Sequence, residues 1–243
     1  MTNRLKLLSP SKIISSIDAI YAHFDLLPNL KLHMRRAASV GKLICNHWQE
    51  NALGTEEKTV IVAALLVHDI GNVVKMDLKS ADSKKMLGAE VKNLLHWKSV
   101  KEKCVKKYGF ESHVATSKMA KEVGIPKSVL RIIQKLSFME NEACLASNDW
   151  VWKICLYADQ RVGPFGVLSL KERYTDFKSR YKRYQEYEGA KGKLVLLEKA
   201  GFALEEQVLK KTDLKAEDIH ERNCILNEDI SANSFAGRQK KRR

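Results

Sequence analysis

One run of apolar residues constrains the fold of this chain more than any other feature. The stretch VIVAALLVHDIGNVVKMD begins with eight consecutive apolar residues, Val60–Val67, and turns polar at His68 and Asp69. Ile61, Leu65 and His68 are spaced as i, i+4 and i+7, so the imidazole shares a helix face with apolar residues. Because burying an imidazole or a carboxylate without a partner is costly, the end of this helix predicts a site where other polar groups meet them.

Helical periodicity recurs along nearly the whole chain, and no segment alternates as a strand does, so we expect an all-α fold. Several starts carry capping signals: Ser9 before Pro10, Thr55 before two glutamates, and the S-x-x-E spacing of Ser169 and Glu172. Asp149 is expected to cap the helix that follows it. The expected helices span residues 9–24, 30–48, 55–69, 84–107, 111–123, 126–138, 149–162, 169–187, 191–211 and 215–226.

Composition places the chain among single-core proteins without a membrane partner. It has 243 residues, 44% of them hydrophobic, which is enough for one substantial core. The longest apolar run is far shorter than the roughly 20 residues of a membrane span, and the N-terminus lacks the apolar core of a signal peptide. The five scattered cysteines include no C-x-x-C pair, which favours reduced thiols, and we expect a cytoplasmic protein.

The net charge of +14 favours negatively charged ligands, such as nucleotides, nucleic acid or phosphorylated metabolites. Part of this charge lies in the terminal GRQKKRR, residues 237–243. Two interpretations of this tail remain open: a disordered, solubilising end, and a weak contact with nucleic acid.

Two further helices carry a metal-capable group on an apolar face. His33 begins a face that continues through Ala37 and Val40, and Asp159 ends a face that includes Cys155. Each group alone is explained as well by core packing or by an ion pair. Together with His68 and Asp69 they form a mixed nitrogen and oxygen donor set that suits a divalent metal.

These residues resemble a known signature. A histidine in an early helix, a His-Asp pair after an apolar run (LLVHDIGN) and a distant aspartate closing another helix (YADQRV) resemble the HD-domain superfamily of metal-dependent phosphohydrolases. The resemblance covers about residues 30–167. It implies that His33, His68, Asp69 and Asp159 hold a metal, which Mn, Fe, Co, Ni, Zn or Mg would each satisfy. It also implies that the metal activates a water to attack a phosphate ester, with Asp69 as a catalytic residue.

The chain departs from the family pattern in two places. His113 matches the first of two extra histidines that bind a second metal in some members, but no histidine lies near Ser137, where the second usually falls. His113 therefore remains a candidate catalytic residue or a packing residue. Asn72 occupies a position where nucleotidase-like members often carry a glutamate that acts on water.

Basic residues near the signature are candidate phosphate contacts. Lys75 follows the His-Asp pair, Arg36 lies one turn after His33, and Arg161 comes two residues after Asp159. Arginine suits bidentate phosphate contact, although each of these residues could equally be a surface charge.

The expected organisation is an HD-type domain at residues 1–168 with its core at 30–167, a C-terminal helical extension at 169–228, and a basic tail at 229–243. The expected function is hydrolysis of a small phosphorylated substrate, foremost a nucleotide. Two alternatives remain: a nucleotide sensor without catalysis, and a nucleic-acid-binding module on the same scaffold. The sequence does not decide the substrate, the metal, monoester or diester cleavage, or the oligomeric state.

Overall fold

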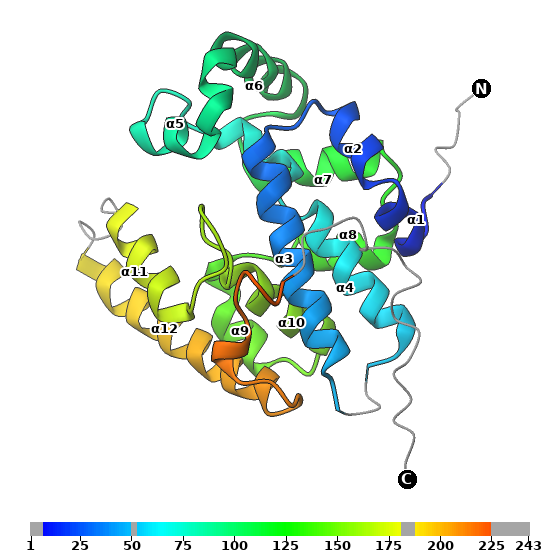
Figure 1. The fold of residues 1–243 in the computed structure, drawn as a ribbon, viewed down its shortest axis with the longest axis vertical. Helices are drawn as coiled ribbons and strands as arrows, with labels where there is room; N and C mark the ends of the chain where they lie inside the picture. The colour runs from blue at the N-terminus through cyan, green and yellow to red at the C-terminus, as the bar shows by residue number, and fades with distance from the viewer. Residues whose placement is uncertain (1–6, 50–52, 181–187, 225–243) are drawn as a thin grey trace.

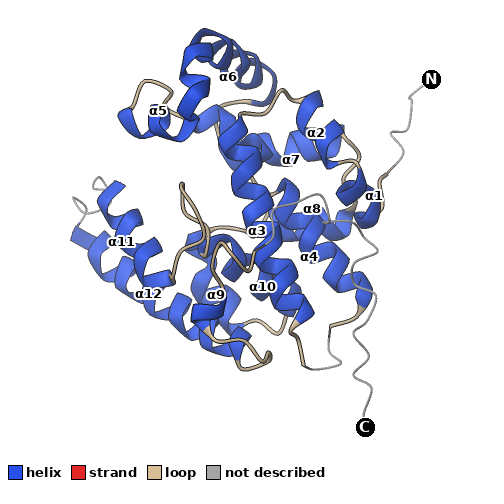
Figure 2. Cartoon of the chain, in the orientation of Figure 1, coloured by secondary structure: helices blue, strands red, loops and turns tan. Residues whose placement is uncertain are grey.

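The computed structural model describes residues 7–49, 53–180 and 188–224, and the side chains of 180–191 are left out of this description. Within these ranges the chain folds into α-helices and short 3₁₀ helices joined by loops (Figure 2). The described residues contain no strand, only isolated bridges between Trp48 and Thr212 and between Val162 and Val167. The expectation of an all-α fold is therefore confirmed.

The centre of the fold is a pair of helices, α3 (Pro28–Asn46) and α4 (Thr55–Val67), with α10 (Trp150–Gln160) packed against both. α1 (Pro10–Ser15) and α8 (Lys127–Ile133) also contact α4. Helices surround α4 on every side, and all of Val60–Val67 is buried. A helix that is apolar all round is stable only in such a position, which explains the uninterrupted apolar run.

The remaining helices lie around this centre (Figure 1). α2 is Ile17–His23, and η1 (Ile70–Lys75) packs against α6 (Leu94–Tyr108) and α7 (Ser112–Glu122). α9 (Asn141–Ala146) and α10 pack against the long α12 (Glu188–Leu209), which also contacts α11 (Leu170–Arg180). The other short elements are α5 (Ala81–Leu87), η2 (Gly88–Asn93), η3 (Phe138–Glu140) and η5 (Ala216–Asp218).

The capping signals mostly act as expected. The side chains of Ser9 and Asp149 accept hydrogen bonds from the first turns of α1 and α10. Ser169 and Glu172 form the reciprocal bonds of a capping box: the Ser169 N–H donates to Glu172 Oε2 at 2.8 Å, and the Glu172 N–H donates to Ser169 Oγ at 3.2 Å. Thr55 was the wrong cap, because Gly54 caps α4 and Thr55 is its first helical residue.

Four expected helices differ in the structure. The helix expected over 9–24 is divided at Ser16 into α1 and α2, and the helix expected over 126–138 ends at Ile133. The helix expected over 84–107 is broken at Gly88, whose positive φ of 55° ends α5 before η2 and α6 begin. The helix expected over 215–226 is only the short η5 as far as residue 224. The carbonyl oxygens of Ala216 and Ile219 accept hydrogen bonds from Arg161, so contacts with another part of the chain hold this segment as well as its own turns. The expected continuation of a helix over 181–187 and the expected basic tail at 229–243 lie outside the described residues.

Among the described residues, no helix combines the length and the apolar character that crossing a membrane requires.

Candidate metal centre

Four side chains from three parts of the chain converge beside the centre of the fold. His33 comes from α3, Asp159 from the last turn of α10, and His68 and Asp69 from the link between α4 and η1. These elements meet because α3, α4 and α10 pack against one another along their apolar faces. The helical spacing that placed each polar group on an apolar face therefore brings the groups together.

The donor atoms are close enough to share one ion. The Nε2 atoms of His33 and His68 each lie 3.1 Å from Asp159 Oδ1. Asp69 Oδ2 lies 3.6 Å from His33 Nε2 and 3.7 Å from His68 Nε2. Around a metal with bonds of about 2.1 Å, adjacent donors are roughly 3.0–3.4 Å apart, so this donor set fits a divalent transition metal.

A hydrogen bond outside the cluster sets the orientation of His68. Its Nδ1 lies 2.8 Å from the carbonyl oxygen of Leu65, so Nδ1 carries the proton that is donated there. The other nitrogen, Nε2, then faces the carboxylates with its lone pair available in the neutral ring. Backbone carbonyls hold many metal-ligating histidines in this way.

The four side chains of the cluster differ in how far they are exposed to solvent. The side chain of His68 is 2% exposed, whereas those of His33, Asp159 and Asp69 are 19%, 23% and 26% exposed. One side of the site is thus closed by the core and the other side is open to a ligand. This is the arrangement that a catalytic metal centre requires, because such a centre keeps a position for water or substrate.

Electrostatics within the cluster are strong. Burial alone would lower the pKa of His68, but the carboxylates of Asp69 and Asp159 outweigh burial and raise the pKa to about 9. Burial alone would raise the pKa of Asp159, but His68 and His33 hold it well below its usual range. Without a metal, the site is an ion pair between a protonated imidazole and a carboxylate.

The glycine after this pair has a steric role. A Cβ on Gly71 would lie 2.2 Å from the backbone nitrogen of Thr116 on α7, and the N–H of Gly71 donates to Thr116 Oγ1 at 3.1 Å. Only a residue without a side chain allows η1 to approach α7 this closely. The HDIG form thus combines two polar residues with a close contact between elements.

The candidate phosphate contacts are dispersed. Lys75 is exposed at the end of η1, and His113 is exposed on α7, which packs against η1. Both lie near Glu111, whose pKa is lowered first by the backbone N–H of Val114 and more weakly by His113 and Lys75. In the described part of the chain, the donor atoms that all lie within 4.8 Å of one another belong to His33, His68 and Asp159. Asp69, although its Oδ2 approaches both imidazoles, and His113 are outside that group.

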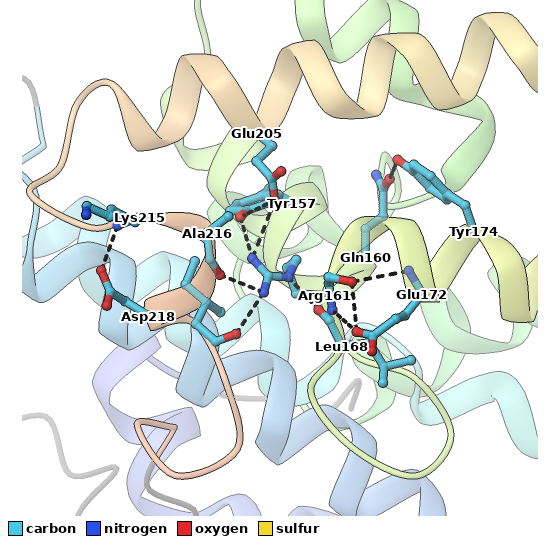
Figure 3. A network of polar contacts seen from close by, with 12 residues as sticks. Tyr157, Gln160, Arg161, Leu168, Glu172, Tyr174, Glu205, Lys215, Ala216 and Asp218 are labelled. Atoms are coloured by element: carbon cyan, nitrogen blue, oxygen red, sulfur yellow. Dashed lines mark hydrogen bonds and ion pairs between the residues drawn. The ribbon is translucent and has the colours of Figure 1, made fainter.

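Arg161 does not lie where a phosphate contact was expected. Its residue is 2% exposed, and its guanidinium donates to the carbonyl oxygens of Leu168, Ala216 and Ile219 at 2.6, 3.1 and 2.7 Å. It also contacts the side chains of Tyr157 and Glu205 (Figure 3). A guanidinium with these partners joins α10 to the C-terminal segment, and we assign it a structural role in place of substrate binding.

Arg36 has a partner that local sequence spacing could not reveal. Its Nε donates to Glu221 Oε1 at 2.8 Å, across a separation of 185 residues. Glu221 belongs to the segment that was expected to be helical. No periodicity connects positions so distant, so only the folded chain identifies this pair.

Comparison with known proteins agrees with this geometry. A family model described as HD domain matches residues 32–213, well over half of the chain. The match extends beyond residue 167, where the resemblance seen in the sequence ended, and includes α11 and α12. Comparisons with curated proteins and with solved structures gave no match.

Proposed function

The chain belongs to the HD-domain superfamily of metal-dependent phosphohydrolases, and on this premise we propose that it hydrolyses a nucleotide or another small phosphate ester. One observation carries the proposal. The Nε2 atoms of His33 and His68 each lie 3.1 Å from a carboxylate oxygen of Asp159 and 3.6–3.7 Å from one of Asp69, and one side of the cluster is open.

His33, His68, Asp69 and Asp159 would hold a divalent ion, with Mn, Fe, Co, Ni, Zn and Mg as candidates. When bound, such an ion polarises a phosphate oxygen and lowers the pKa of a water molecule. His68 is fixed by its bond to Leu65 and serves as a ligand. Asp69 is the most exposed of the four, and we assign its Oδ1 to accept a proton from the attacking water.

Basic side chains on the elements that carry or contact the candidate ligands support a phosphate substrate. Arg36 lies one helical turn from His33, and Lys75 ends the 3₁₀ helix that begins just after Asp69. His113 is carried by the helix that packs on this 3₁₀ element. We propose that Arg36 and Lys75 contact the phosphate and that His113 lies beside the leaving group.

A second candidate function is nucleotide sensing without turnover. Asn72 favours it, because an amide has no basic oxygen to accept a proton from water, and it occupies a position where related enzymes often carry a glutamate. A sensor would bind a nucleotide tightly and release no phosphate over hours, whereas an enzyme would release phosphate in proportion to metal content.

A third candidate, nucleic-acid binding, is favoured by exposed lysines on α6, among them Lys103, Lys106 and Lys107. Binding of this kind would weaken steeply with salt, because it depends on phosphate contacts. An affinity for RNA that is insensitive to salt would exclude it.

The deciding experiment is metal analysis by mass spectrometry of protein purified without chelators or a histidine tag, followed by a screen of phosphate esters. The wild type is expected to hold metal and to release phosphate, and the double variant His68→Ala/Asp69→Ala to lose both while remaining helical by circular dichroism. His96→Ala is the matched control, because His96 is an exposed histidine that pairs with Asp25 outside the cluster. Unchanged metal content and phosphate release in the double variant would refute the proposal.

A further inference from the structure

The segment that follows α12 lies along α3. We call residues 212–224 the C-terminal strap. It begins with a bridge between Thr212 and Trp48, just past the end of α3, and reaches Arg36 in the N-terminal half of α3 through Glu221. The strap therefore runs antiparallel to α3 (Figure 1). Its contact at Arg36 lies three residues after His33 on that helix.

Buried anchors hold the strap in place. The guanidinium of Arg161 donates to the carbonyl oxygens of Ala216 and Ile219, at 3.1 and 2.7 Å (Figure 3). Ile219 and Cys224 are each only 2% exposed. Glu221 lies between these two buried residues, so the fold imposes its position.

The carboxylate of Glu221 connects the helix that carries His33 to the loop that follows the helix that carries Asp159. Oε1 accepts from Arg36 Nε at 2.8 Å, and Oε2 accepts from the backbone N–H of Val167 at 2.9 Å. Arg36 is on the helix of His33, and Val167 is in the loop after the helix of Asp159. The side chain of Arg36 is 13% exposed and that of Glu221 is 41% exposed, so the arginine end of this ion pair is shielded from water and the carboxylate end is accessible.

The contact between Arg36 and Glu221 lies one turn from a candidate metal ligand and beside a hollow in the surface. Arg36 and His33 are three residues apart on one helix, which places their side chains on neighbouring turns of the same face. Beside Glu221 the surface is hollowed, and Val167, His220, Glu221 and Arg222 line the hollow. A phosphate that displaced the Glu221 carboxylate would pair with Arg36, one helical turn from the candidate ligand His33.

We propose that Glu221 is an internal anion that occupies the phosphate position at Arg36, and that it restricts the substrate to molecules with a terminal, dianionic phosphate. This inference rests on the proposed function, in which Arg36 contacts the phosphate. A phosphate monoester carries nearly two negative charges at neutral pH and can displace a singly charged carboxylate. A phosphodiester carries one charge and gains nothing over a carboxylate that the fold already holds in place.

The test compares two anions on metal-free protein: inorganic phosphate at pH 8, which is mostly dianionic, and dimethyl phosphate, which is a monoanion. Dissociation constants are measured by phosphorus NMR for the wild type, Glu221→Gln and Arg36→Gln. Glu217→Gln is the matched control, because it removes the same charge from an exposed position of the same strap. The glutamine at 221 keeps an acceptor for the Val167 N–H.

We expect the wild type to bind inorganic phosphate about tenfold more tightly than dimethyl phosphate. In Glu221→Gln, the affinity for dimethyl phosphate should rise by about fivefold or more. The ratio between the affinities for inorganic phosphate and dimethyl phosphate would then become smaller. Glu217→Gln should bind both anions as the wild type does. Arg36→Gln should weaken phosphate binding. An unchanged preference in Glu221→Gln, or weaker binding of both anions, would overturn the inference, as would no binding to the wild type.

If Glu221→Gln fails to fold, the Arg36→Gln variant decides, since unchanged phosphate affinity in that variant contradicts the inference. The experiment needs neither metal nor turnover. If the protein held no metal or released no phosphate, the proposed function would be refuted. The affinities for the two anions could still be measured and compared.

Discussion

At the scale of single residues, the fate of each polar group depends on what the fold places opposite it. His68 faces two carboxylates, and Arg161 faces three backbone carbonyls. Both are almost completely buried. The first therefore belongs to a candidate metal site, and the second to a fixed structural contact.

The raised pKa of His68 leads to a pH dependence. In metal-free protein the pKa is about 9, against 6.5 for an ordinary histidine, because the nearby carboxylates outweigh burial. The stabilisation from this ion pair is complete below pH 6.5 and is lost as the pH rises through 9. Metal must displace the His68 proton, so metal affinity should rise by about tenfold per pH unit across this window. A competition titration with a chromophoric chelator checks this, and a flat profile would contradict it.

Replacing Arg161 should destabilise the protein. Arg161→Met leaves buried carbonyl oxygens of Leu168, Ala216 and Ile219 without their donor, and we expect the free energy of unfolding to fall by about 3 kcal/mol. Urea denaturation measures the loss.

The matched control for this prediction is Arg131→Met. Arg131 is 55% exposed and pairs with Asp149, so its removal should cost less than about 1 kcal/mol. An equal decrease in the free energy of unfolding in the two variants would show that the buried contacts of Arg161 contribute no more to stability than an exposed ion pair.

At the scale of elements, close contacts explain why two positions in the packed helices are glycines. α7 packs on η1 through Gly71, and α3 packs on α4 through Gly41, where a Cβ would lie 2.4 Å from Leu65 Cδ1. The second contact involves a flexible side chain and can adjust, whereas the first involves backbone and cannot.

Gly71→Ala should therefore be disruptive. The added methyl group would overlap the backbone of Thr116, and we expect a loss of about 1–3 kcal/mol in the free energy of unfolding, with weaker metal binding because Asp69 is two residues away. Thermal denaturation and metal titration check both effects. Gly192→Ala is the control: nothing lies within 4 Å of its Cβ in α12, so alanine should be neutral or stabilise by up to about 1 kcal/mol. Similar behaviour of the two variants would contradict the steric explanation.

At the scale of the whole molecule, the four candidate ligands tie together α3, the end of α4 and α10. An ion bound there stabilises the folded chain because the unfolded chain lacks the assembled site. The strap adds a second long-range connection, since it joins the C-terminal part of the chain to α3 and α10.

Removing the metal should lower the melting temperature. With free metal at 100 times its dissociation constant, the stabilisation is about 2.7 kcal/mol, which corresponds to a shift of roughly 5–10 °C for a chain of this size. Differential scanning calorimetry before and after treatment with a chelator measures the shift, and the His68→Ala/Asp69→Ala variant should show none. An equal shift in that variant would place the stabilising metal elsewhere.

The sequence by itself determined the helical class and the four candidate metal ligands, because both depend on local spacing: a residue's position on a helix face follows from its neighbours in the chain. Only the tertiary structure decided the roles of Arg161, Arg36 and Glu221. Their partners lie up to 185 residues away, and nothing local distinguishes a buried arginine from an exposed one. The short η5 in place of a longer helix has the same origin, since contacts with Arg161 override local helical preference. The break at Gly88 is local, because the positive φ of this glycine ends α5.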